Sequence, residues 1–99
     1  MAEIRWTEEA FLWLQKIFNY IIQDDPDAAQ RVVQGIYDKA QILKAFPEIG
    51  YKYRIEPEGE IRILLYGHYR IAYIHKHSTI FIRIKSYGYF ATIVNSSAA

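Results

Sequence analysis

The spacing of apolar residues changes once along this 99-residue chain, and that change limits the folds open to it. As far as about residue 46, apolar side chains recur every three or four positions, which indicates amphipathic helices. From Tyr51 onward they recur at every second position, which indicates short strands. Helices followed by strands, rather than alternating with them, predict an α+β fold with the helices on one side of an antiparallel sheet.

The first half predicts two helices joined by a short turn. Thr7 precedes two glutamates, a typical helix start, because a hydroxyl caps free backbone N–H groups and acids suit the positive end of the helix dipole. Asp25 followed by Pro26 starts a second helix, and Pro47 with Gly50 beyond it ends that helix. We expect the two helices to form an antiparallel hairpin. Their predicted core stripes are Ala10, Phe11, Leu14, Ile17, Phe18, Ile21 and Ile22, and then Ala29, Val32, Val33, Ile36, Ala40, Leu43 and Phe46.

The second half predicts a β-meander. Gly59, Gly67 and the segment 76–78 divide it into short runs, and consecutive strands joined by such tight turns run antiparallel. Residues 4–6 are a candidate edge strand, which gives a sheet of four to five strands. The predicted strands are 51–56, 60–66, 69–75 and 79–85.

Alternation assigns the strand residues to two faces of the sheet. The face expected to pack under the helices carries Ile61, Ile63, Leu65, Ile71, Tyr73, Ile80, Ile82 and Ile84. The other face carries Arg62, Leu64, Tyr66, Arg70, Ala72, Ile74, Phe81, Arg83 and Lys85. Because this second set mixes cations with large apolar side chains, we expect a partner to cover it.

The formal net charge of +1 hides a polarity. Residues 1–49 contain five Lys and Arg and eight Asp and Glu, a net charge of −3, whereas residues 50–99 contain seven and three, a net charge of +4. An acidic helical half therefore backs a basic sheet, which favours an acidic partner on the sheet.

Length and composition predict one domain over residues 1–94, followed by a small polar tail, 95–99, that we expect to be disordered. The chain contains no cysteine, which excludes a disulfide scaffold and fits a reducing compartment. We see no signal peptide and no apolar run of bilayer length, so we expect a cytoplasmic protein with no membrane partner.

The residues favour binding over catalysis. His68, His75 and His77 are the only histidines, and without cysteines or nearby acids we expect no metal site and no cofactor. No nucleophile elbow or phosphate loop is present. The basic residues Arg54, Arg62, Arg70, Arg83 and Lys85 can converge on one surface flanked by Tyr66, Tyr87 and Tyr89. Such a surface suits phosphate, an acidic protein segment, or simple charge pairing across strands.

Three motifs resemble the toxins of the RelE/ParE superfamily of bacterial type II toxin–antitoxin systems, over roughly residues 3 to 90. They are Asp25-Pro26-x-Ala28-Ala29, Leu43-x-x-Phe46-Pro47-x-x-Gly50 and Tyr69-Arg70-Ile71-x-Tyr73. The first two resemble the ParE branch, known as plasmid-stabilisation proteins, more than the RelE branch.

The resemblance implies a toxin with one of two activities. ParE-like members inhibit DNA gyrase, whereas RelE-like members are ribosome-dependent mRNA endoribonucleases. A ribonuclease would use Arg54, Arg70, Lys85 and Tyr87. The segment 85–91 lacks the family's usual His or Arg, so gyrase inhibition is favoured and the catalytic residues are unknown. A degenerate, non-toxic member is a third possibility.

The resemblance also implies a cognate antitoxin as partner, with DNA contacted only through that antitoxin. Gyrase or the ribosome would be the target, and a homodimer or a toxin–antitoxin heterotetramer are both open. The residues predicted to bind target or antitoxin are Arg62, Leu64, Arg70, Ile74, Phe81, Arg83, Lys85 and Tyr87.

Overall fold

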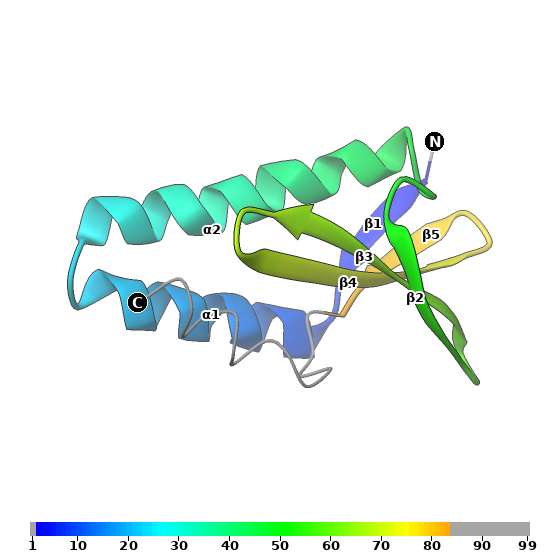
Figure 1. Cartoon of the computed structure of the whole chain (residues 1–99), viewed down its shortest axis with the longest axis horizontal. Coiled ribbons are helices and arrows are strands. Elements are labelled where there is room, and N and C mark those ends of the chain that lie inside the picture. The colour runs from blue at the N-terminus through cyan, green and yellow to red at the C-terminus, as the bar shows by residue number, and fades with distance from the viewer. Residues whose placement is uncertain (1, 84–99) are drawn as a thin grey trace.

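The computed structural model describes residues 2–83 and shows two helices packed on a mostly antiparallel sheet (Figure 1). The helical elements are α1 (Glu8–Ile22), α2 (Pro26–Gln41) and the short 3₁₀ helix η1 (Ile42–Lys44). The strands are β1 (Glu3–Trp6), β2 (Tyr51–Glu56), β3 (Gly59–Tyr66), β4 (Tyr69–Lys76) and β5 (Thr79–Ile82), and their order in the sheet is β1-β5-β4-β3-β2. This architecture confirms the predicted α+β fold.

The predicted meander is confirmed, because β2, β3, β4 and β5 pair in turn and antiparallel. The predicted edge strand is also present: β1 pairs parallel to β5, with Ile4 aligned to Ile80. Within the described residues β5 ends at Ile82, so positions 84 and 85 of the predicted last strand, like the predicted tail, lie outside the part described.

Both helices start at the predicted caps. The Thr7 hydroxyl oxygen accepts a hydrogen bond from Ala10 N at 3.2 Å and donates one to Ile82 O at 2.8 Å, which ties the start of α1 to the end of β5. The Asp25 carboxylate accepts from Ala28 N at 3.1 Å. α2 ends earlier than predicted, since the chain tightens into η1 after Gln41 and no longer follows an α-helical path to residue 46. In the described residues no helix has the length and apolar character needed to cross a membrane.

The core lies between the helices and one face of the sheet. α2 packs against β3 and β4. The predicted stripes are wider than this core, because Phe11 and Phe46 are 59% and 60% exposed. The fully buried large side chains of the core are Ile17, Ile36, Leu43, Ile71, Tyr73, Ile80 and Ile82.

The predicted face of β3 is wrong. Ile63 lies opposite Ala72 and Leu64 lies opposite Ile71, and directly opposed residues of an antiparallel pair project to the same face. Leu64 therefore joins Ile71 in the core under the helices. Ile61 and Ile63 belong to a second buried cluster on the other face, with Ala72 and Ile74. Because β3 is apolar at 61, 63, 64 and 65, the alternation of residue types could not show which of its residues face the helices.

Candidate protein-binding face of the sheet

The sheet face turned away from the helices, here called the open face, combines arginines with apolar side chains. The strand register defines its members, because aligned neighbours share a face. Arg83 extends the face past the end of β5, where its backbone N–H donates to Ala72 O at 2.7 Å. The open face comprises Glu3, Arg5, Tyr51, Arg54, Glu56, Gly59, Ile61, Ile63, Leu65, Arg70, Ala72, Ile74, Lys76, Thr79, Phe81 and Arg83.

The centre of the open face is apolar and its margin is more exposed. The central cluster of Ile61, Ile63, Ala72 and Ile74 is almost wholly buried, and Tyr53 packs against it. Leu65, toward the β3–β4 turn, is 52% exposed. Because the central cluster is already shielded from solvent, the apolar contact that this face offers to a partner comes from accessible side chains such as Leu65.

Four arginines of the open face come from four different places in the sheet. Arg70 on β4 donates from Nη1 to the Tyr51 hydroxyl at 3.2 Å. The other three each lie near an acid: Arg5 Nε is 3.3 Å from Glu3 Oε1, Arg54 Nη2 is 2.6 Å from Glu56 Oε2, and Arg83 Nη1 is 3.8 Å from Glu58 Oε1. Of these three ion pairs, only Arg5–Glu3 is well exposed on both sides, and such a pair contributes little to stability. Glu56 and Arg83 are 20% and 23% exposed.

Arg5 was missed by the sequence reasoning. β1 was predicted only as an edge strand, and its face could not be assigned without a partner strand. The parallel register aligns Arg5 with Phe81 and so places it on the open face.

Arg62 does not lie on the open face, contrary to the prediction that it shares the face of Arg70. Its register partner is Tyr73, which belongs to the core under the helices. Its side chain is 13% exposed, and Nη1 donates to Glu48 O at 3.0 Å and to Gly50 O at 2.8 Å. Nη2 lies 3.3 Å from a carboxylate oxygen of Glu60. Arg62 therefore holds the loop that leads from η1 into β2.

Tyr73 holds the same loop from the neighbouring strand. Its hydroxyl accepts from Gly50 N at 3.0 Å and donates to Pro47 O at 2.9 Å. Burial raises the pKa of the Tyr73 hydroxyl, which keeps the proton that it donates. A Cβ on Gly50 would lie 2.7 Å from the Tyr73 hydroxyl oxygen and 2.8 Å from Ile63 O, so this close approach requires glycine. Two of the three motifs quoted for the resemblance, those that contain Gly50 and Tyr73, thus meet in one contact.

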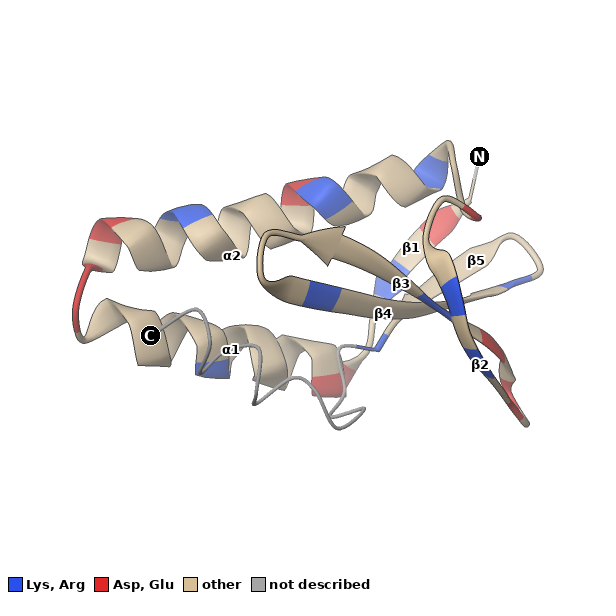
Figure 2. Ribbon diagram, viewed as in Figure 1, with Lys and Arg blue, Asp and Glu red and all other residues tan. Residues whose placement is uncertain are grey.

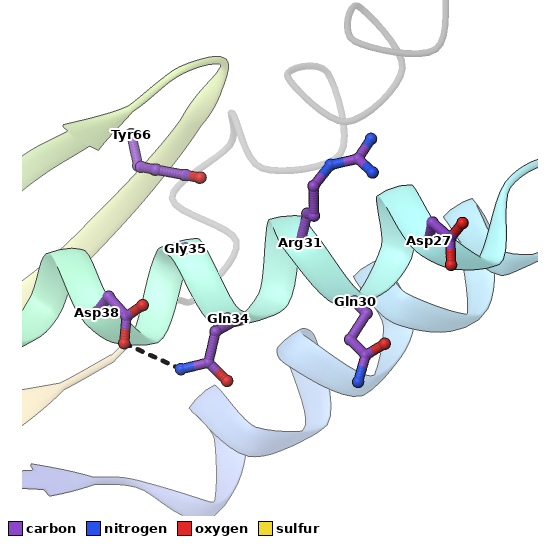
Figure 3. Close-up of a pocket in the computed structure, with 7 residues that line it drawn as sticks. All are labelled: Asp27, Gln30, Arg31, Gln34, Gly35, Asp38 and Tyr66. Carbon is purple, nitrogen blue, oxygen red and sulfur yellow. Dashed lines mark hydrogen bonds between the residues drawn. The ribbon is translucent and has the colours of Figure 1, made fainter.

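Tyr66 also lies away from the arginines that it was predicted to flank. Its ring crosses α2 over Gly35, as Figure 3 shows, and a Cβ at that glycine would collide with the phenol. The polar side chains beside it belong to α2, where Gln34 Nε2 donates to Asp38 Oδ1 at 2.9 Å. Tyr66 is therefore a packing residue between β3 and α2.

The other predicted site residues fall into two groups. Ile74, Phe81 and Arg83 lie with Arg70 on the open face, as predicted, although no contact with a partner tests their role. Lys85 and Tyr87, together with Tyr89, lie outside the described residues.

No metal centre is visible in the part of the chain that the structure describes, since no group of three or more His, Asp or Glu side chains there can hold a metal ion. His75 is aligned with Ile80, so it lies on the helix-facing side of the sheet. His77 is in the β4–β5 turn, with a φ of 56°.

Comparisons with known proteins agree with this fold. A curated relative, the putative toxin Y4kP of Sinorhizobium fredii (strain NBRC 101917 / NGR234), is 43% identical over 58 residues. That match covers 59% of this chain and 60% of the relative, which is less than two thirds of the relative's length. A solved structure from the chromosomal ParDE TA system of P. aeruginosa matches with a TM-score of 0.69 at 24% identity. The match covers 83% of this chain and 90% of that one and shows a shared fold.

A family model described as the ParE toxin of the type II toxin-antitoxin system, parDE, matches residues 4–87. The match includes both helices, β2 to β5, all of β1 except Glu3, and the arginines of the open face. Since it spans most of the chain, the chain belongs to the ParE toxin family of type II toxin–antitoxin systems, within the RelE/ParE superfamily.

Proposed function

We propose that this toxin arrests growth by inhibiting DNA gyrase, and that a cognate antitoxin neutralises it by covering the open face. Membership of the ParE family supports the toxin role, and the family name of the solved relative, a ParDE system, supports an antitoxin partner. The target and the covered surface are our proposals for this chain.

The observation that carries the proposal is the combination of chemistry on the open face. An apolar cluster lies at its centre, and Arg54, Arg70 and Arg83 approach from three parts of the sheet. Guanidinium groups bind carboxylates through paired hydrogen bonds, and an accessible side chain such as Leu65 provides an apolar contact. This face therefore suits a protein segment that carries both acidic residues and apolar anchors.

A ribonuclease of the RelE kind is the second candidate, because Arg54 and Arg70 share the open face as that activity would require. Cleavage through the RNA 2′-hydroxyl needs a base and an acid near the phosphate, in addition to positive charge. The Arg54 guanidinium contacts Glu56, and His75 lies on the helix-facing side of the sheet. Among residues 2–83 the arrangement thus favours binding over acid–base catalysis.

The direct test adds the purified chain to gyrase and a relaxed plasmid. We expect supercoiling to stop, and the product of the adjacent reading frame to restore it. Arg70→Ala should weaken the inhibition or its reversal, whereas Arg31→Ala, an exposed position on α2, should change neither.

Three results would argue against the proposal. Full supercoiling together with in-frame mRNA cleavage in a translating extract would make the chain a ribonuclease. Normal growth of cells that express it, with neither activity, would make it a degenerate member. If the product of the neighbouring gene does not bind the chain, the proposal that it is the antitoxin is contradicted.

A further inference from the structure

The loop between η1 and β2, residues 45–49, exposes two large apolar side chains. Phe46 is 60% exposed and Ile49 is 53% exposed. They border an open cleft of about 380 Å³ whose lining residues all belong to this loop: Ala45, Phe46, Pro47, Glu48 and Ile49. Neither side chain belongs to a core cluster or to the open face, so neither of those regions explains their apolar character.

The backbone of this loop is firmly held although its side chains are exposed. Arg62 and Tyr73 together bind backbone groups of Pro47, Glu48 and Gly50. Within the loop, the N–H of residue 46 donates to the carbonyl of residue 42 at 3.0 Å, and the N–H of residue 49 donates to the carbonyl of residue 46 at 3.2 Å. The two exposed side chains are therefore carried on a fixed backbone, which lowers the entropy lost when a partner binds them.

The charges that flank the loop are basic. Lys44 precedes it and Lys52 follows it, and Figure 2 shows basic residues at the end of the helical segment and on β2. The Lys52 side chain is 71% exposed, with Nζ 3.9 Å from Glu60 Oε2. Glu48 is the only acid among residues 44–52, and its carboxylate lies 3.6 Å from Arg62 Nη2. The apolar pair is therefore bordered by positive charge.

These features favour a pocket on a folded protein as the occupant. Exposed side chains on a fixed backbone act as anchors that fill apolar pockets in a partner. Positive charge beside the anchors is complementary to carboxylates at the border of such a pocket. Two copies of this chain would instead bring the lysines of both loops together, which opposes self-association through this surface.

We infer that Phe46 and Ile49 dock the toxin into an apolar pocket, bordered by carboxylates, on the folded protein that it inhibits. The inference rests on the proposed function for the identity of that protein, gyrase. It also connects the two surfaces, because Tyr51, two residues after Ile49, lies on the open face and contacts Arg70. An antitoxin segment that covers this contact would lie beside the loop and obstruct the docked target.

Supercoiling assays with gyrase and variants of the full chain test the inference. Phe46→Gln and Ile49→Gln should each raise the toxin concentration needed for half inhibition by at least about tenfold, because each removes an anchor. The matched control is Ile55→Gln, which removes an isoleucine on β2 that is 82% exposed and should raise that concentration by less than about twofold. Lys44→Glu should raise it by about threefold, and this effect should shrink as salt is added.

A second measurement separates target binding from antitoxin binding. The affinity of the adjacent reading frame's product for Phe46→Gln and Ile49→Gln should stay within about twofold of its affinity for the original chain. Melting temperatures equal to that of Ile55→Gln would exclude unfolding as the cause of lost inhibition. The two loop variants should therefore lose inhibition of gyrase while they still bind the antitoxin.

Three outcomes would overturn the inference and leave gyrase as the target: full inhibition by the two loop variants, an equal loss in Ile55→Gln, or a parallel loss of antitoxin affinity. The last would make the loop part of the antitoxin surface. A dimer in sedimentation that disappears in Ile49→Gln would make a second copy the occupant. If the original chain itself does not stop supercoiling, the proposed function fails and the inference fails with it, so the two failures are distinguishable.

Discussion

The two faces of the sheet use arginine in opposite ways. On the helix-facing side, Arg62 is largely buried and donates to two backbone carbonyls of the loop before β2. On the open face, Arg70 donates to a tyrosine hydroxyl at the surface. The difference teaches that an arginine in a strand cannot be assigned to partner binding by its position in the sequence alone. The groups that its guanidinium contacts in the folded chain show whether the arginine is structural or available to a partner.

The consequences of removing the two arginines should differ for a physical reason. Without Arg62, the carbonyl of Gly50 loses its donor in a partly buried setting, and an unsatisfied buried acceptor destabilises the folded state. Without Arg70, water reaches the exposed Tyr51 hydroxyl and replaces the lost donor. Arg62 on the helix-facing side therefore stabilises the fold, whereas Arg70 on the open face is available to a partner.

The largest effect is expected at the loop that Arg62 holds. Gly50→Ala places a methyl group against the Tyr73 hydroxyl and the carbonyl of Ile63, and a backbone atom cannot move aside cheaply. We expect a loss of about 3 kcal/mol in the free energy of unfolding, measured with urea. A loss below about 1 kcal/mol would show that the loop is free to shift.

The second prediction sets the two arginines against each other. Arg62→Ala should lower the free energy of unfolding by about 2 kcal/mol, because it leaves the partly buried carbonyl of Gly50 unpaired. Arg70→Ala should change it by less than about 0.5 kcal/mol, as a surface substitution. Equal losses of unfolding free energy in the two variants would contradict the distinction between a structural Arg62 and a surface Arg70.

Tyr73→Phe sharpens the comparison through pH. Loss of the hydroxyl should reduce the free energy of unfolding by about 1.5 kcal/mol at neutral pH. Because burial raises the pKa of the folded Tyr73 above the unfolded value near 10, the folded state holds this proton more tightly. The contribution is complete below about pH 10 and is lost as pH rises through the folded pKa.

Denaturation curves at successive alkaline pH values check this prediction. The original chain should lose stability more steeply than Tyr73→Phe above about pH 10. Parallel slopes for the two proteins would mean that this hydroxyl does not carry the pH dependence.

Local signals in the sequence were reliable guides to the fold. Thr7 and Asp25 start their helices through hydrogen bonds to residues three positions away, and the short turns at Gly67 and His77 fix the order of the strands. No local signal shows which residues of β3 face the helices, because apolar residues occupy both of its faces. The pairing with β4, in which Leu64 lies opposite Ile71, determines which residues those are.

The candidate site was predicted in part. Arg70, Phe81 and Arg83 share one face because β4 and β5 alternate regularly. Arg62 was misassigned because its partners, Glu48 and Gly50, lie 14 and 12 residues away in the sequence. No periodicity encodes such a contact, and only the folded chain brings these groups together.

The central claim is that the open face, through Arg70, binds the antitoxin. The most direct measurement is the affinity of the adjacent reading frame's product for Arg70→Glu, compared with Arg31→Glu on the exposed side of α2. Both variants change the net charge equally. Arg70→Glu should raise the dissociation constant by at least about tenfold, and Arg31→Glu by less than about threefold. Equal changes in the two variants would contradict the claim, because the affinity would then depend on net charge and not on the open face.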